Sequence, residues 1–158
     1  MDWSMWGAIG EISGGLAVVI SLVYVGRQVR LGNALARAEA YRSVSTAMSQ
    51  LTREWARDPL FVPVVREGIL GGSAGIEAFS PDDQTRAILH LATAVRVFET
   101  VHRQVEAEIL GPEAYDMLGG VMFRTQLFRD VWPHLHQAYA PDFAQFMEER
   151  FDLSPGGP

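Results

Sequence analysis

The hydrophobic residues are distributed very unevenly along the chain. The segment from Met5 to Gly26 contains a single charged side chain, Glu11. As an α-helix it would be about 33 Å long, which is enough to cross a hydrocarbon core about 30 Å thick. Trp3 and Trp6 lie at one end and Tyr24 near the other, as aromatic residues do at membrane interfaces. The pattern therefore predicts one N-terminal transmembrane helix.

The next segment, residues 31–57, has the period of an amphipathic helix. An apolar residue recurs every three or four positions and gives one apolar face: Ala34, Ala38, Tyr41, Val44, Met48, Leu51 and Trp55. We interpret it as a juxtamembrane stalk helix that ends at Asp58-Pro59. At Gly32-Asn33 two arrangements are compatible with the sequence, namely a break from the anchor or one continuous helix.

The remaining sequence also predicts helices, because no stretch shows the strict alternation of a half-buried strand. Ser80 and Pro81 are a typical helix start, and Gly111-Pro112 is a typical end. The expected helices are 59–70 (with Pro63 delaying its start), 81–110, 112–119, 121–131 (broken near Trp132-Pro133) and 141–151. The expected fold class is all-α. It comprises an anchor with a basic flank (1–30), the stalk (31–57), a small cytoplasmic helical bundle (58–152) and a disordered tail (153–158).

The charges divide the chain in the same places. The net charge of −6 combines −2 over residues 1–26, +4 over 27–57 and −8 over 58–158. Because the positive flank of a membrane helix stays in the cytoplasm, we expect a protein of the inner (plasma) membrane with its N-terminus outside and its C-terminal domain cytoplasmic. Arg27, Arg30 and Arg37 are the expected contacts with anionic lipid headgroups. The acidic balance argues against nucleic-acid binding.

Two other interpretations of the apolar segment are less favourable. A cleaved signal peptide needs a basic start and a small-residue cleavage site, and the segment has neither. A buried helix of a soluble protein rarely runs this far with one charge.

Small residues recur along the predicted anchor at spacings of three and four, which places them on one helical face. This small-residue seam consists of Gly7, Gly10, Gly14, Ala17 and Ser21. Membrane helices associate through close packing at such residues. We therefore expect a homo-oligomer or contact with another membrane subunit. Glu11 is read as reaching the outer interface, with a hydrogen bond to a partner helix as the alternative.

The main candidate for chemistry lies on the predicted long helix. His102 falls on its apolar face, and Glu99 and Glu106 lie one turn away on either side. Glu99 and His102 together match the Glu-x-x-His motif of carboxylate-bridged di-metal bundles, but that chemistry needs two such motifs, and this chain has one. We read His102 as a core histidine, and a metal site at this pair as the alternative. His134 and His136 do not share a helical face and are read as packing residues.

Several chemistries are excluded by composition. The chain has no cysteine, and all thirteen basic residues are arginine, so thiol and lysine chemistry are ruled out. No serine lies in a nucleophile-elbow motif. We expect no catalytic activity, no metal and no cofactor.

The chain resembles a widespread group of uncharacterised bacterial proteins. The resemblance rests on Gly7-Ala8-Ile9-Gly10-Glu11, Tyr24 to Arg30, Phe98-Glu99, Trp132 and Pro141-Asp142-Phe143. It departs at Leu31-Gly32, where polar residues are more usual. The resemblance implies a transmembrane helix followed by a small cytoplasmic helical domain, and no known activity.

The sequence thus favours a single-pass membrane protein that acts as an accessory or scaffolding subunit of other membrane proteins. The alternatives are a metal-dependent enzyme or sensor centred on Glu99 and His102, and a soluble helical module that binds lipid.

Overall fold

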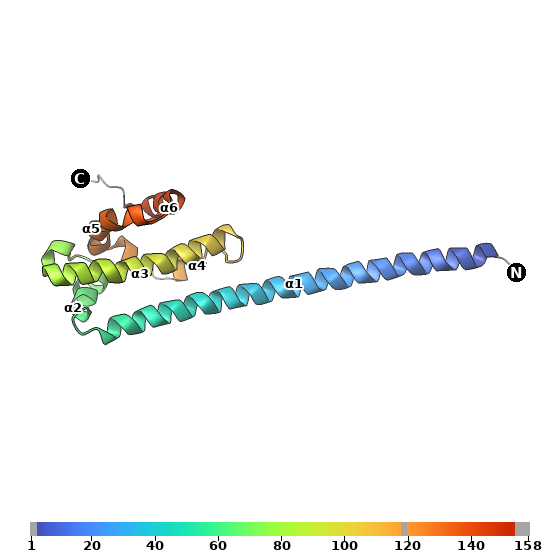
Figure 1. The fold of residues 1–158 in the computed structure, drawn as a ribbon, viewed down its shortest axis with the longest axis horizontal. Helices are drawn as coiled ribbons and strands as arrows, with labels where there is room; N and C mark the ends of the chain where they lie inside the picture. Colours follow the sequence, from blue (N-terminus) through green and yellow to red (C-terminus); the bar gives the residue numbers. More distant parts are fainter. Residues whose placement is uncertain (1–2, 118–119, 154–158) are drawn as a thin grey trace. The chain divides into compact units, whose positions relative to one another are not determined.

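The protein is all-helical in a computed structural model (Figure 1). The structure describes the backbone of residues 3–117 and 120–153, and their side chains except those of residues 3–10, 12–13 and 117. Within these residues there is no strand. The expected all-α class and the long N-terminal apolar helix are both confirmed.

The first helix, α1, runs from Trp3 to Arg57 without interruption. It passes through Gly32-Asn33 as regular helix, so of the two arrangements open at this point the continuous helix is the one found. The chain divides into two compact units, Met1–Glu39 and Ala40–Pro158. The first unit is the apolar part of α1, and the second unit contains the last part of α1 and every other helix.

The second unit is built on α3, the longest helix after α1. Helix α3 packs against α4 and α5, and α6 follows the short turn that ends α5. The elements after α1 are α2 (Val62–Val64), the π-helix η1 (Val65–Leu70), α3 (Pro81–Glu106), α4 (Ala114–Met117), α5 (Gln126–Leu135), α6 (Pro141–Phe151) and three short 3-10 turns, η2 (Ile76–Ala78), η3 (Met122–Arg124) and η4 (His136–Ala138).

Side-chain caps set two of the helix starts. The Ser80 hydroxyl accepts a hydrogen bond from the backbone N–H of Asp83, and Pro81 takes the first turn of α3, as the sequence predicted. Thr125 caps α5 in the same way by accepting from the N–H of Phe128. Both caps satisfy N–H groups that a helix start leaves without a partner.

The expected ends of two helices are wrong. Helix α3 ends at Glu106 rather than 110, because the backbone turns left-handed at Glu108 (φ 56°) before reaching Gly111. Helix α5 runs through Pro133 to Leu135 instead of breaking there. The proline removes one helical hydrogen bond, and the burial of Trp132 and Leu135 on the same helix outweighs that loss.

The segment after α1 also differs from expectation. The helix expected from residue 59 begins only at Val62, with Pro63 in its first turn, and it continues as the π-helix η1. Asp58, which precedes the expected start, does not cap α2, whose N-cap residue is Phe61. Its carboxylate accepts instead from the N–H of Leu60, two residues on, in a local turn.

The core of the second unit is largely aromatic. Its most deeply buried large side chains are Trp132, Phe61, Phe123, Phe128 and Phe143. Helix α1 contributes two fully buried residues, Val44 and Leu51, and the partly buried Tyr41, Met48 and Trp55. This matches the apolar face predicted for the stalk, except that Ala34 and Ala38 are exposed.

Leu153 corrects the expected disordered tail. It is only 4% exposed and belongs to the core, because the left-handed turn at Asp152 sends its N–H back to the carbonyl of Glu148. Residues 154–158 lie outside the described part of the chain.

Candidate functional site

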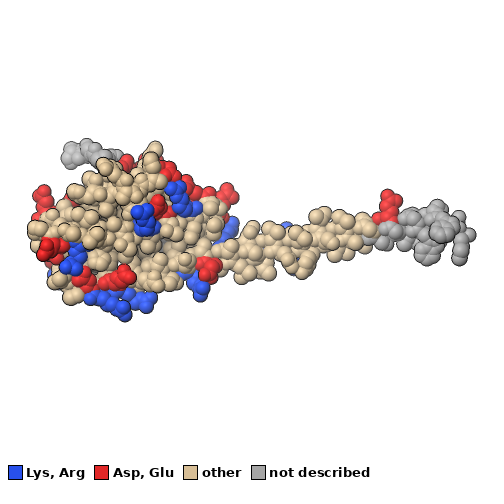
Figure 2. All heavy atoms as spheres, in the orientation of Figure 1, with Lys and Arg blue, Asp and Glu red and all other residues tan. Residues whose placement is uncertain are grey.

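The first unit presents a nearly unbroken apolar surface. From Leu16 to Leu35 the large apolar side chains are each 55–66% exposed, close to what a helix without neighbours leaves. Figure 2 shows this stretch as almost entirely uncharged on the face drawn. The part of this helix from Gly14 to Arg57 contains a window that is long and apolar enough to cross a membrane by length and composition, and none of that window is buried. These residues form an apolar belt with no protein packed on it within the described chain.

The small-residue seam lies within this belt only in part. Gly14, Ala17 and Ser21 are exposed, and a Cβ added at Gly14 would meet no atom within 4 Å. The Ser21 hydroxyl donates to the carbonyl of Ala17 at 2.8 Å, so it needs no water. Gly7 and Gly10 lie outside the residues whose side chains are described.

The polar residues of the first unit are also exposed. Glu11 is on the surface of the helix, and so are Arg27, Arg30 and Arg37. The amide of Gln28 donates to the hydroxyl of Tyr24 at 2.6 Å and closes a polar pair one turn long. The side chains of these three arginines are therefore exposed, which contact with lipid headgroups would require.

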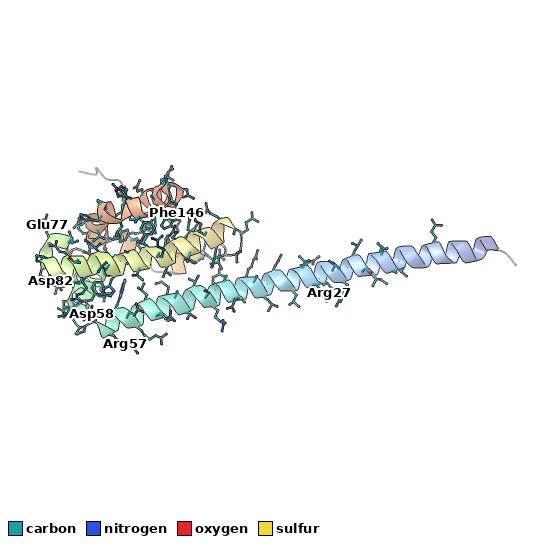
Figure 3. The ribbon with its side chains drawn as sticks, in the orientation of Figure 1. Arg27, Arg57, Asp58, Glu77, Asp82 and Phe146 are labelled. Atoms are coloured by element: carbon teal, nitrogen blue, oxygen red, sulfur yellow. The ribbon has the colours of Figure 1, made fainter. Side chains whose placement is uncertain are left out.

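His102 occupies a buried aromatic pocket in the second unit. It is 5% exposed, and its ring stacks on Phe146 with centroids 4.2 Å apart. Its Nδ1 lies 2.9 Å from the Tyr115 hydroxyl. Its Nε2 lies 3.6 Å from a carboxylate oxygen of Glu106 and has no hydrogen-bond partner among the described residues. Figure 3 labels Phe146 on α6, the helix that closes this pocket.

The electrostatics of this pocket favour a neutral imidazole. Burial is the main cause that lowers the pKa of His102, and the nearby carboxylates, Glu106 foremost, oppose the shift only in part. Burial likewise raises the pKa of the Tyr115 hydroxyl, so the pair shares an uncharged hydrogen bond at neutral pH.

Glu99 makes its contacts elsewhere. It accepts a 2.7 Å hydrogen bond from Arg96, whose guanidinium also lies over the Tyr139 ring at 4.4 Å. The structure thus places Glu99 in an ion pair and His102 in an aromatic pocket. No group of three or more histidine, aspartate or glutamate residues is placed to hold a metal ion among the residues described. His136 lies just after α5, and its Nδ1 contacts the backbone carbonyl of Pro133.

A polar cluster joins the end of α1 to α3, and sequence reasoning missed it. The Asp58 carboxylate accepts from Arg86 at 2.8 Å and lies 3.4 Å from His90 Nε2. The His90 ring stacks on Phe61 at 4.1 Å. Burial alone would raise the pKa of Asp58, but the hydrogen bonds from Arg86, Leu60 and His90 together lower it. The labelled Asp58 in Figure 3 sits at this junction.

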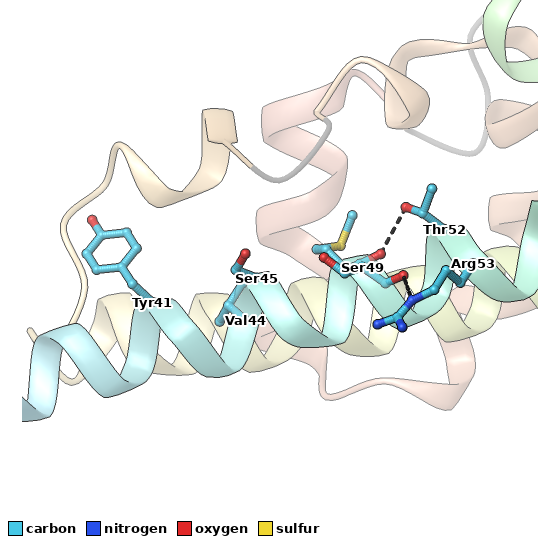
Figure 4. A pocket seen from close by; sticks show the side chains of 7 residues that line it. Tyr41, Val44, Ser45, Ser49, Thr52 and Arg53 are labelled. Atoms are coloured by element: carbon cyan, nitrogen blue, oxygen red, sulfur yellow. Dashed lines mark hydrogen bonds between the residues drawn. The ribbon is translucent and has the colours of Figure 1, made fainter.

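A groove follows α1 from Tyr41 to Trp55 and was not predicted either. It consists of two adjoining hollows of about 470 and 270 Å³ that share Met48 and Thr52. The first is lined by Tyr41, Val44, Ser45, Met48, Ser49, Thr52 and Arg53, most of them visible in Figure 4. The second adds Leu51, Trp55, Ile69, Leu70, Val121 and Met122. We call the two together the α1 groove.

Comparison with known proteins adds no assignment to these features: no family model matches the chain, and neither the curated proteins nor the solved structures compared with it give a match. The functional argument therefore rests on the apolar belt and the α1 groove.

Proposed function

We propose that the first part of α1 spans a membrane and that the chain is a non-enzymatic accessory subunit anchored there. The observation that carries this proposal is the apolar belt from Leu16 to Leu35, whose large side chains are all more than half exposed. A soluble monomer rarely leaves an apolar patch larger than a few hundred Å² in water. Lipid is the environment in which such a belt is stable.

The internal hydrogen bonding of the belt fits a lipid environment. The belt lies in the interior of α1, where each backbone N–H has an acceptor one turn earlier in the same helix, which is what a hydrocarbon core demands. The hydroxyl of Ser21 is satisfied by the carbonyl of Ala17. The helix also continues into the second unit, where Val44 and Leu51 are buried, so the belt belongs to an element that the folded domain uses.

The arginine distribution supports an orientation with the second unit in the cytoplasm. Arg27 and Arg30 lie in the C-terminal half of the belt and Arg37 just beyond it, whereas no arginine precedes Leu16. Juxtamembrane arginines contribute about 1 kcal/mol each near an anionic surface, so these three would also bind anionic headgroups.

The partner in this proposal is another membrane protein or a second copy of the chain, packed on the small-residue seam. Gly14 and Ala17 have exposed faces on which a second helix could approach closely. The role of the second unit is then to contact a cytoplasmic component.

The experiment uses the absence of cysteine and of lysine from the sequence. With no cysteine in the native sequence, a single cysteine at the exposed Ser73 reports the location of the second unit through a membrane-impermeant maleimide. With no lysine, an impermeant amine reagent can modify only the N-terminal amine. We expect the amine to be labelled in intact spheroplasts and Ser73→Cys only after lysis. Recovery of the chain in the soluble fraction would refute the proposal.

A further inference from the structure

We propose that the α1 groove binds an amphipathic helix of a partner protein, with an acidic residue of that helix beside Arg53. This inference goes beyond membrane anchoring, since it concerns a site in the second unit. It rests on the shape, the apolar rim and the charge of the groove.

The groove has the dimensions of a helix seat. Tyr41 and Trp55 are fourteen residues apart on α1, which corresponds to about 21 Å or four helical turns at 1.5 Å per residue. Helix-in-groove recognition uses an apolar face of this length with anchors three or four residues apart. Met48 lies where the two hollows meet, and its flexible side chain suits an adaptable contact.

The rim of the groove is apolar and exposed. Leu70 is 79% exposed and Val121 is 78% exposed, and both line the second hollow beside the partly buried Trp55. Two large aliphatic side chains that line one hollow and are this exposed are typical of an interface without its partner.

The charges around the groove specify the partner. Residues 58–158 carry a balance of −8, yet among the described side chains that line the groove the only ionised one is Arg53. Arg53 donates to the backbone carbonyl of Ser49 and has no ion pair within the described chain. At the opposite end, Tyr41 donates to the carboxylate of Glu113. An acidic residue therefore fits the Arg53 end of the groove and not the Tyr41 end.

Two other occupants fit less well. A second copy would need a free amphipathic helix in its own second unit, but α6 buries Phe143, Met147 and Phe151 in its core, and α5 buries Trp132. A lipid acyl chain would lie against the hydroxyl-bearing Ser45, Ser49 and Thr52 along the wall in Figure 4. A protein helix can match both the hydroxyls and the apolar rim.

The test measures binding of a synthetic probe to the full chain in detergent micelles. The probe is a stapled fourteen-residue helix with leucine on one face and glutamate along its edges, and the control peptide has lysine in place of glutamate. We expect the glutamate peptide to bind at least tenfold more tightly than the lysine peptide. Arg53→Glu should reverse that preference, and the double variant Leu70→Ser with Val121→Ser should weaken both peptides at least tenfold.

Matched controls lie away from the groove. Leu89→Ser removes a leucine of α3 that is 64% exposed, and Arg129→Glu reverses an exposed charge on α5. Neither variant should change binding. Absence of binding, equal binding of the two peptides, or loss of binding with the control variants would overturn the proposal. Self-association abolished by the groove variants would assign the groove to a second copy instead. Membrane fractionation tests the proposed anchoring independently. A negative result in the peptide-binding assay would therefore not bear on the anchoring.

Discussion

A charge placed in the middle of the apolar belt is the sharpest test of membrane insertion. Val19 is 56% exposed and lies among Leu16, Val18, Ile20 and Leu22, which are exposed to a similar degree. On an insertion scale, each such residue contributes about 0.3–0.6 kcal/mol near the centre of a spanning helix, so seven of them between Leu16 and Val25 supply about 2–4 kcal/mol. An arginine at the same depth costs about 2.5–3.5 kcal/mol.

Val19→Arg should therefore cancel most of the insertion free energy of the belt. The cost of the arginine and the lost contribution of the valine add to about 2.8–4.1 kcal/mol. The expected change is therefore a fall of roughly 100- to 850-fold in the ratio of inserted to extracted chain, since each 1.4 kcal/mol is a factor of ten. The assay is the distribution of the chain between membrane pellet and supernatant after alkaline extraction. The matched control is Val29→Arg, which puts the same charge among the arginines of the flank and should change little. If Val19→Arg and the native chain partition equally, the apolar belt does not lie in lipid.

The other predictions concern the second unit and use urea unfolding monitored by circular dichroism. Gly68→Ala should destabilise by about 1–3 kcal/mol, because a Cβ there would lie 2.5 Å from a methyl carbon of Leu127, whereas Ala at the open Gly72 position would test only backbone strain. His102→Phe should make the free energy of unfolding less dependent on pH below about 6.5. The folded pKa of His102 is lowered, so the native chain loses stability as pH falls below the unfolded value of 6.5, and a variant that loses stability just as steeply would contradict the burial argument. Asp58→Asn should lower stability at neutral pH by leaving Arg86 without its carboxylate. Since the folded pKa of Asp58 is lowered, the gap between native and variant should narrow as pH falls through 3.8, and a gap independent of pH would exclude the ion pair as its cause.

The sequence predicted those parts of the fold that depend on local pattern. The start of α3 at Pro81 and the bounds of α6 follow from caps, prolines and apolar periodicity within a few residues. The inward direction of His102 also followed from its place on the apolar face of α3.

The predictions were wrong where tertiary contacts determine the local structure. Pro133 is a helix breaker by local chemistry, but the helix face that buries Trp132 keeps α5 intact. Leu153 was expected in a disordered tail, and only its burial in the core of the second unit shows otherwise. The cluster of Asp58, Arg86 and His90 joins residues about thirty positions apart, a distance at which spacing carries no signal.

The α1 groove could not be predicted from the sequence for a related reason. Its α1 wall was recognisable as one face of an amphipathic helix, but Leu70 and Val121 come from separate short elements. Which side of an amphipathic helix remains open depends on how much of it the rest of the fold covers.

The burial of Leu153 also has a consequence for how the chain is made. The core of the second unit uses Val44 near its start and Leu153 near its end, and α6 supplies Phe143, Met147 and Phe151 between them. At the usual rates of synthesis, roughly 5 to 20 s separate the emergence of Val44 from that of Leu153. The apolar belt leaves the ribosome before either. In the proposed membrane anchoring, the belt would therefore be available for insertion during the whole interval in which the second unit cannot yet close, and insertion would precede the folding of that unit.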